Sequence, residues 1–496
     1  MNYRLLSRVF GALLLLITIG MAACLGYAYW DQSKGVENHG AQALLWSTCI
    51  TGLAGLALFL VGGRSGNQLL RKEAIVVVGL GWFVCSVFAM IPYLFCEPGL
   101  GFAPALFEAV SGLTTTGSTV IGNLQSFPDS ILLWRNVTQF FGGVGILVLF
   151  VALLSYLGSG GKTLFRAESS ARVGEGTATR IRQLALRLLG VYLALTTVAL
   201  LGLHFLGLSW FDAVCHAMTS VATGGFSNYD ASIAHFRTVP GINAVALESF
   251  LTLIMAAGAT SFFIYLAVVQ RRWSRLRNAE ESRWFLIVLV VATALVTVNL
   301  TFERDATRSF PEALLEALFN VVSISTTTGY ATSDFSAWPG FSVALIFTLM
   351  FIGGCSGSTA GGIKIARVLL FLKVARQEVI AAFRPRQVLR IRLNKAPAED
   401  SARAAVLFAC LYAACLFIGT LTVALLEPNE DFHTCFSATA ATLFNIGPGI
   451  SDVGPTENFS IFGSPSLLFM CLLMVMGRLE LFAVLALFVP SLWKKY

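Results

Sequence analysis

Long runs of apolar residues dominate the chain. A helix needs about 20 apolar residues to cross a bilayer. Stretches of that kind predict ten membrane-spanning helices, at residues 9–30, 42–63, 74–97, 131–157, 184–206, 242–269, 284–303, 341–375, 402–427 and 466–490. Between some of them lie apolar stretches of 10 to 14 residues that carry Thr and Gly. These are too short to span, and we expect them to be re-entrant.

Composition supports a membrane protein. By length alone, 496 residues would predict two or three soluble domains. Hydrophobic residues make up 56% of the chain and charged residues 12%, about half the ~25% typical of soluble domains. This excludes a soluble enzyme, a disordered scaffold and a secreted disulfide-bonded domain. The ten cysteines form no CxxC pair, so we interpret them as small reduced hydrophobic residues.

The net charge of +7 reflects membrane topology rather than nucleic-acid binding. Six segments carry 28 of the 34 Lys and Arg residues and 8 of the 27 acidic residues. They are the N-terminus, 64–73, 158–187, 270–283, 364–403 and the C-terminus. Because positive loops stay inside, these segments and both termini are predicted to be cytoplasmic. The two longest, 158–187 and 364–403, also offer a docking surface for a cytoplasmic partner.

This orientation reveals a fourfold repeat. Each short stretch has its tip outside, between an outgoing span and an incoming span. The tips read SGLTTTGST (111–119), TSVATGGFS (219–227), SISTTTGYA (323–331) and TLFNIGPGI (442–450). We take their shared glycines to be Gly117, Gly224, Gly329 and Gly447, spaced by 107, 105 and 118 residues. Repeats one and three share seven of eleven residues over 107–117 and 319–329.

The predicted fold is an all-α polytopic membrane protein in which a unit of span, short half-helix, Gly-bearing loop and span occurs four times and can surround one central axis. Two extra N-terminal helices precede the repeats. The expected boundaries are 1–66 for the two extra helices, 67–160 for repeat 1, 161–275 for repeat 2, 276–385 for repeat 3 and 386–496 for repeat 4. In the third short stretch, Ser309, Pro311 and Glu312 form a helix-start signal.

The tips are suited to binding a cation. Each follows the C-terminus of a short helix, which carries about half a negative charge. Glycine lets the backbone turn its carbonyl oxygens inward. Rings of such oxygens replace the water shell of potassium in channel filters. Packing of small residues between helices is the alternative explanation for these glycines, and we assign it to Gly142, Gly143 and Gly258.

A second feature interrupts the span at 341–375. The run GGCSGSTAGG (353–362) has five glycines in ten residues, followed by Lys364. Each glycine lowers helix stability by up to ~1 kcal/mol relative to Ala. Irregular backbone at membrane depth is tolerated only against protein or a water-filled cavity. We therefore expect a loop below the tips that faces the pore and gates it, with a tightly packed kink as the alternative.

The third feature is Arg478, in the apolar run LLMVMGRLELF (472–482). An arginine at the centre of a span costs ~2.5–3.5 kcal/mol to insert, so it needs a partner inside the protein. Glu480 lies two residues away, on another helix face. Carbonyl groups of the 353–362 loop are the better candidates, and the arginine would raise a barrier to cations. A structural buried ion pair is the alternative.

Catalysis has no support in the sequence. The five histidines lack metal-ligand spacing, and no nucleophile elbow, Walker A motif or dinucleotide-binding loop occurs. We therefore expect no enzyme activity, no organic cofactor and no catalytic residues. A membrane-embedded enzyme or assembly scaffold stays an alternative only in the absence of ion flux.

Together the four tips, GGCSGSTAGGIK and the GRLE run at 477–480 resemble the Trk/Ktr/HKT potassium transporter superfamily. The likeness covers nearly the whole chain, and the two extra N-terminal spans favour the TrkH/TrkG type over the shorter KtrB type. Glycine at all four shared positions favours potassium, because plant relatives with serine at the first one transport sodium. Ala222 is a mild departure, since the other repeats carry Thr or Asn there.

The resemblance implies four span–pore-loop–span repeats around one ion path, with an ion site and a gate. The implied ion-binding residues are Thr115, Thr116, Gly117, Ala222, Thr223, Gly224, Thr327, Thr328, Gly329, Asn445, Ile446 and Gly447. The implied gating residues are Gly353, Gly354, Gly357, Gly361, Gly362, Lys364 and Arg478.

The resemblance also implies a biological setting. The chain would be the K⁺-translocating subunit of a Trk-type uptake system in a bacterial inner membrane. It would form a homodimer, with one pore in each subunit, and bind a cytoplasmic TrkA-type ring that binds nucleotides. Potassium would flow inward with the membrane potential, worth ~2.3 kcal/mol per charge per 100 mV. Proton- or sodium-coupled symport along the same path is the alternative, although the sequence shows no convincing intramembrane chain of acidic residues or histidines.

Overall fold

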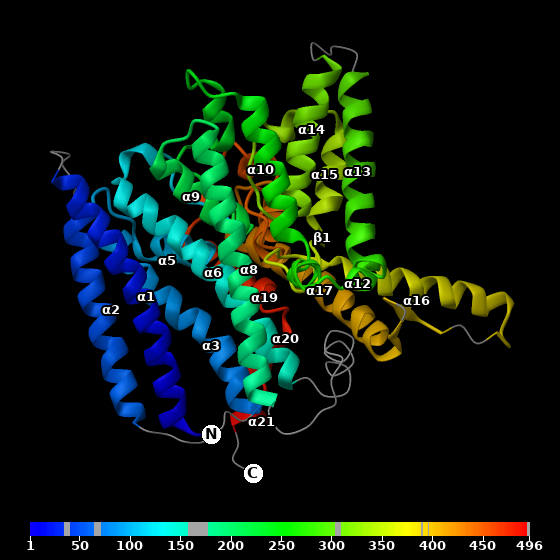
Figure 1. The fold of residues 1–496 in the computed structure, drawn as a ribbon, viewed down its shortest axis with the longest axis horizontal. Coiled ribbons are helices and arrows are strands. Elements are labelled where there is room, and N and C mark those ends of the chain that lie inside the picture. Colours follow the sequence, from blue (N-terminus) through cyan, green and yellow to red (C-terminus); the bar gives the residue numbers. More distant parts are fainter. Residues whose placement is uncertain are drawn as a thin grey trace.

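The computed structural model describes residues 1–33, 40–63, 71–156, 177–302, 309–387, 390–394 and 396–493. They form a bundle made almost entirely of helices (Figure 1). In this part of the chain, six helices are long and apolar enough to cross a membrane, and one sharply bent pair makes a seventh. Most of the predicted segment 158–187 lies outside the described residues.

Long helices or helix pairs cover eight of the ten predicted spans, and seven of these eight run without a sharp bend. They are α1 (Tyr3–Gln32), α2 (Gly40–Gly62), α3 (Arg71–Ala89) with α4 (Ile91–Phe95), α6 (Asp129–Tyr156), α8 (Thr177–Phe205), α10 (Ala244–Ala259) with α11 (Phe262–Val269), α13 (Glu280–Thr301) and α17 (Glu399–Leu426). Helices α1 and α2 pack side by side (Figure 1). A side chain at Gly11 would meet the backbone of Gly55 and Phe59, so glycine permits this close approach.

Four short helices match the predicted re-entrant stretches. They are α5 (Phe102–Leu113), α9 (Trp210–Val221), α14 (Phe310–Ser325) and α18 (Phe432–Leu443). Three of them begin at a polar capping residue. Ser309 and Glu312 form the predicted capping box of α14, Ser209 accepts from the Asp212 N–H, and Asp431 accepts from the Thr434 N–H. Helix α14 has 16 residues and is longer than expected.

Three apolar stretches are broken, where the sequence predicted one break. The predicted break in 341–375 lies between α15 (Gly340–Met350) and α16 (Ile365–Phe383), and the parallel strands β1 (Ile352–Gly353) and β2 (Ile363–Lys364) pair within it. The stretch 242–269 bends by 92° between α10 and α11. The stretch 466–490 divides into α19 (Ser464–Arg478), α20 (Phe482–Leu487) and α21 (Pro490–Trp493). Prediction of continuous spans at 242–269 and 466–490 was therefore wrong.

Short elements complete the described chain. They are α12 (Trp273–Arg277), the antiparallel strands β3 (Arg392–Leu393) and β4 (Ala396–Pro397), and 3-10 turns at Leu124–Ser126, Ser232–Arg237, Phe335–Ala337, Ser451–Val453 and Phe459–Ile461. Leu6, Val76 and Leu492 pack in one apolar cluster. The start of α1 and helix α21 therefore lie at the same end of the molecule (Figure 1). That arrangement agrees with termini on the same side of a membrane.

Candidate functional site: four tip loops and a broken segment

The four short helices end in loops with the same backbone course. We call residues 114–119, 222–227, 326–331 and 444–449 the tip loops. The second residue after each helix has a positive φ: 52° at Thr115, 52° at Thr223, 56° at Thr327 and 53° at Asn445. This left-handed conformation is uncommon for β-branched residues, and such strain concentrates at functional sites.

The next residue closes each turn through the same hydrogen bond. The N–H groups of Thr116, Gly224, Thr328 and Ile446 donate to carbonyls five residues earlier, at 2.9 to 3.0 Å. The residue after it is a glycine with positive φ: 89° at Gly117, 77° at Gly225, 81° at Gly329 and 106° at Gly447. The four tip loops are thus equivalent, residue by residue.

This equivalence corrects the predicted alignment of repeat 2. The counterpart of Gly117 is Gly225 rather than Gly224, and Gly224 corresponds to Thr116. Ala222 is the C-terminal cap of α9, as Thr114 is of α5, so it lies at the first position of its tip loop. The second position, where the other loops carry Thr or Asn, is occupied by Thr223, so repeat 2 does not depart from the pattern there. Because Gly224 and Gly225 are adjacent, residue identity alone allows either of them to align with Gly117. The backbone conformation selects Gly225. The hydroxyl residues Ser111, Thr219 and Ser323, six residues before the glycine, were a signal for this alignment.

The tip loops close into a ring. A side chain at Gly117 would overlap the carbonyl oxygen of Gly224 in repeat 2. In the same way, Gly225 meets the Thr328 carbonyl, and Gly329 meets the Ile446 carbonyl. A side chain at Gly447 would come within 3.0 Å of the Thr116 carbonyl oxygen, which completes the circle. Four helix C-termini therefore converge on a ring of close backbone contacts, and their dipoles favour a cation there.

Hydroxyl groups brace part of this ring. The Oγ1 atoms of Thr114 and Thr116 lie 2.7 Å apart, as do those of Thr326 and Thr328. The Asn445 amide donates to Thr116 Oγ1 at 2.9 Å, which links repeat 4 to repeat 1. All five side chains are buried. The predicted ion-site residues of repeats 1, 3 and 4 therefore lie together at the ring.

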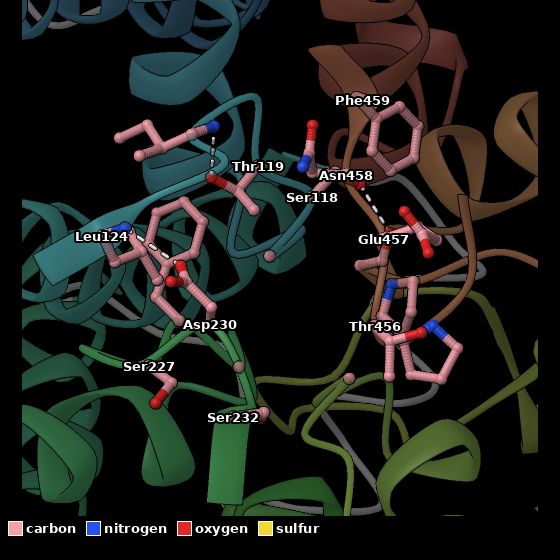
Figure 2. Close-up of a pocket in the computed structure, with 18 of the residues that line it drawn as sticks. Ser118, Thr119, Leu124, Ser227, Asp230, Ser232, Thr456, Glu457, Asn458 and Phe459 are labelled. Atoms are coloured by element: carbon pink, nitrogen blue, oxygen red, sulfur yellow. Dashed lines mark hydrogen bonds between the residues drawn. The ribbon is translucent and has the colours of Figure 1, made fainter. Parts of the chain in front are cut away.

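An outer cavity of ≈ 100 Å³ opens above the ring (Figure 2). Gly117, Gly225, Gly329 and Gly447 all line it. Its wall carries hydroxyl, amide and acidic side chains, namely Ser118, Thr119, Ser227, Asp230, Ser232, Thr456, Glu457 and Asn458. Asp230 accepts a hydrogen bond of 2.9 Å from the Leu124 N–H, which fixes this carboxylate at the wall (Figure 2).

The broken segment, residues 352–364, lies directly against the ring. The Gly361 N–H donates to Thr327 Oγ1 over 2.6 Å. A side chain at Gly361 would meet the Phe444 carbonyl, and one at Gly353 would overlap the Gly361 carbonyl. Lys364 donates back to the Ala360 carbonyl. Of the predicted gating residues of this segment, Gly361 and Gly362 thus lie next to the tip loops.

The broken segment docks into the bend between α10 and α11. The Cys355 N–H donates to the Ala259 carbonyl at 2.9 Å, and the Phe262 N–H donates to the Gly357 carbonyl at 3.0 Å. Thr359 Oγ1 donates to carbonyls of Val221 and Gly258. Each interruption therefore satisfies backbone groups that the other leaves free, as burial requires.

Arg478 joins the broken segment to repeat 1. It is buried, with 3% exposure, and its Nη1 donates to the Thr359 carbonyl at 2.8 Å. Its Nη2 reaches the Gly142 carbonyl of α6 at 3.4 Å. The expectation of a carbonyl partner in the 353–362 loop is confirmed. Glu480 instead pairs with Arg367 of α16 at 2.5 Å.

An inner cavity of ≈ 50 Å³ lies beside these groups. Its lining includes Gly357, Gly361, Gly362, Lys364 and Arg478. Glu480 also lines it, so two positive side chains and one carboxylate face a narrow space next to the broken segment. A cation that entered this space in the present conformation would meet both positive charges, while the Glu480 carboxylate is paired with Arg367.

Sequence reasoning missed two parts of this site. Glu281, buried at the start of α13, accepts from the Ser356 N–H at 2.5 Å and so holds the broken segment from the third repeat. The second is the bend at Thr260, where the sequence predicts a continuous span. The run GATS at 258–261, with small and hydroxyl residues inside an apolar stretch, was the available signal.

Comparison with known proteins identifies the family. A family model described as TrkH, cation transport protein, matches residues 53–495. The chain is 32% identical to the Trk system potassium uptake protein TrkH of Halomonas elongata over the full length of both chains. It is 35% identical to TrkI of that organism, over 88% of this chain and 87% of the relative.

A solved structure agrees over the whole chain. The crystal structure of the potassium transporter TrkH from Vibrio parahaemolyticus matches with a TM-score of 0.88 and 30% identity, covering 100% of each chain. Family and fold thus coincide, and they agree with the expectation of a transporter rather than an enzyme. This chain belongs to the TrkH family of cation transport proteins.

Proposed function

We propose that this protein is the potassium-translocating membrane subunit of a Trk-type potassium uptake system. The closed ring of four equivalent tip loops carries this proposal, because it gathers four helix C-termini and many backbone carbonyls around one point. The relatives, named as potassium uptake proteins, supply the ion. Rings of carbonyl oxygens are the known means of replacing the water shell of potassium.

The proposed selectivity filter comprises three consecutive residues from each tip loop. For repeats 1, 3 and 4, the proposed filter residues are those predicted from the sequence. For repeat 2, the structural register replaces the predicted set with Thr223, Gly224 and Gly225. Thr116, Gly224, Thr328 and Ile446 then form one layer, and the four positive-φ glycines form the layer above it.

The proposed gate is the broken segment together with Lys364 and Arg478. In the described conformation, the segment lies against the inner side of the ring and Arg478 bridges it to α6. A positive side chain on the ion path opposes cations electrostatically. Opening would therefore require Arg478 to leave the Thr359 carbonyl and the segment to move from the ring.

The proposed setting follows the family. The protein would lie in a bacterial inner membrane with both termini in the cytoplasm, as a homodimer. A cytoplasmic TrkA-type ring would dock on the basic segments 158–187 and 364–403. Helix α16 lies within the second of these segments and projects away from the bundle (Figure 1).

Growth at limiting potassium tests the function. Expression in a bacterial strain that lacks its own potassium uptake systems, together with the matching cytoplasmic ring, should restore growth and uptake of potassium. A chain carrying Gly117→Pro, which cannot adopt the positive φ of that position, should not restore them. Equal growth with both chains, at equal membrane levels, would contradict the proposal.

A further inference from the structure

The repeat 2 tip loop lacks the side-chain brace that supports the loops of repeats 1 and 3. In those repeats, paired threonines lie at the first and third loop positions, with their hydroxyls 2.7 Å apart. Repeat 2 has Ala222 and Gly224 at the equivalent positions, so it has no hydroxyl at either. Repeat 4 also lacks this pair, and its Asn445 side chain links it to Thr116 instead, so we expect a comparable side-chain support for the repeat 2 loop.

Gln139 of α6 supplies that support. Its Nε2 donates to the Gly224 carbonyl at 2.7 Å, and its Oε1 accepts from the Phe226 N–H at 3.1 Å. The side chain is fully buried. A side chain at Gly224 would overlap the Gln139 amide group. The glycine that breaks the repeat pattern therefore makes room for the amide that replaces the missing brace.

The same face of α6 makes further contacts with this loop. Arg135, one turn before Gln139, donates to the Ser227 carbonyl at 2.9 Å and pairs with buried Glu108 at 2.7 Å. Asn136 donates to Asn228 at 2.8 Å. Residues four apart share a helix face, so repeat 1 holds the repeat 2 loop along its length.

We infer that Gln139 is a positioning residue that sets the shape of the repeat 2 filter loop and thereby the preference for potassium over sodium. The inference rests on the proposed filter function. The Gly224 carbonyl belongs to the layer that contacts the glycine of the neighbouring repeat, here Gly117. Loss of the amide leaves this carbonyl and the Phe226 N–H without their partner. The loop then relaxes and the ring no longer fits one ion size.

The test compares Gln139→Met with Asn299→Leu in proteoliposomes. Met keeps the length of the side chain and removes both hydrogen bonds. Asn299 accepts a hydrogen bond from Ser342, which joins α13 to α15. Asn299→Leu therefore also removes a part-buried amide, but one whose hydrogen bond does not involve the tip loops. Gln139→Met should lower the potassium-to-sodium flux ratio by about tenfold, the scale of a lost net hydrogen bond. Asn299→Leu should keep the wild-type ratio.

A double-mutant cycle separates positioning from general damage. Gly224→Ala alone should lower the ratio as Gln139→Met does, because the new methyl group displaces the amide. In a Gln139→Ala background that space is free, so Gly224→Ala should add little further change. Additive effects, or an unchanged ratio in well-folded Gln139→Met, would overturn the inference.

The filter proposal and this inference fail differently. If Gly117→Ser alters the ratio while Gln139→Met does not, the filter stands and the positioning role is wrong. If neither substitution alters the ratio, the filter assignment itself is wrong. Protein yield and monodispersity in detergent identify any variant that fails to fold, and Gln139→Ala, which removes the amide by truncation, then provides the measurement.

Discussion

The backbone N–H of Gly361 and the hydroxyl of Thr327 are joined by a 2.6 Å hydrogen bond. One belongs to the broken segment and the other to the third tip loop. Both residues are buried, so no bulk water is available to replace the bond if it breaks. The proposed gate and the proposed filter are therefore mechanically connected at this point.

Substitution of Thr327 by Val tests that connection. Val keeps the β-branched shape and removes the acceptor, which leaves a buried N–H unpaired at a cost of about 1–3 kcal/mol. The broken segment should be held less tightly, and basal potassium flux should rise several-fold. Thr348→Val is the matched control, because its hydroxyl bonds only within α15. Flux equal to wild type in Thr327→Val would show that the bond does not hold the gate.

The register of repeat 2 makes a second prediction. Gly225→Ser places a side chain at a positive φ and against the Thr328 carbonyl, as Gly117→Ser does against Gly224. Both should lower the potassium-to-sodium flux ratio by about tenfold or more, equivalent to about 1.4 kcal/mol.

Ala222→Ser provides the contrast. The equivalent Thr114 satisfies its hydroxyl with the Val110 carbonyl of its own helix, so a hydroxyl at this cap is readily accommodated. The flux ratio should stay near wild type. A large loss of selectivity in Ala222→Ser, with none in Gly225→Ser, would restore the alignment that takes Gly224 as the shared glycine.

Removal of the buried arginine should open the path. Arg478→Ala eliminates a positive charge and two hydrogen bonds that bridge the broken segment to α6. Basal flux should increase several-fold, measured without the cytoplasmic partner. Arg478→Lys keeps the charge but cannot span both carbonyls, so its flux should lie between that of the wild type and that of Arg478→Ala. Wild-type flux in a well-folded Arg478→Ala protein would exclude the arginine from gating.

Glu281 should restrain the broken segment through the Ser356 N–H. Glu281→Ala removes the acceptor and should raise basal flux. Glu281→Gln keeps a carbonyl oxygen at the same place and should stay close to wild type. Uptake of radioactive rubidium into proteoliposomes compares the two variants directly. Identical behaviour of Ala and Gln would mean that the carboxylate, rather than the hydrogen bond, is what matters.

The sequence predicted the coarse architecture well, because membrane insertion makes strong demands on it. Apolar length located seven of the continuous spans, and the glycine-rich run at 353–362 located one break. The orientation rule exposed the four short helices. Each of these inferences depends on local composition, which the bilayer constrains directly.

The predictions that were wrong concern features whose local structure depends on tertiary contacts. The bend at Thr260 is stabilised by hydrogen bonds to the distant broken segment, which no local pattern reveals. The register of repeat 2 depends on room for Gln139, a residue of another repeat. The carbonyl partner predicted for Arg478 is confirmed. This prediction was possible because a buried cation needs an acceptor, and the acid nearest in sequence, Glu480, lies on another helix face.

Cation flux through the purified protein in proteoliposomes tests the central claim most directly. Potassium and sodium gradients would be imposed in turn, with the membrane potential set by an ionophore for a different ion. The account predicts potassium-selective flux whose reversal potential follows the potassium gradient alone. Flux that needs a proton or sodium gradient, or that does not distinguish potassium from sodium, would contradict it.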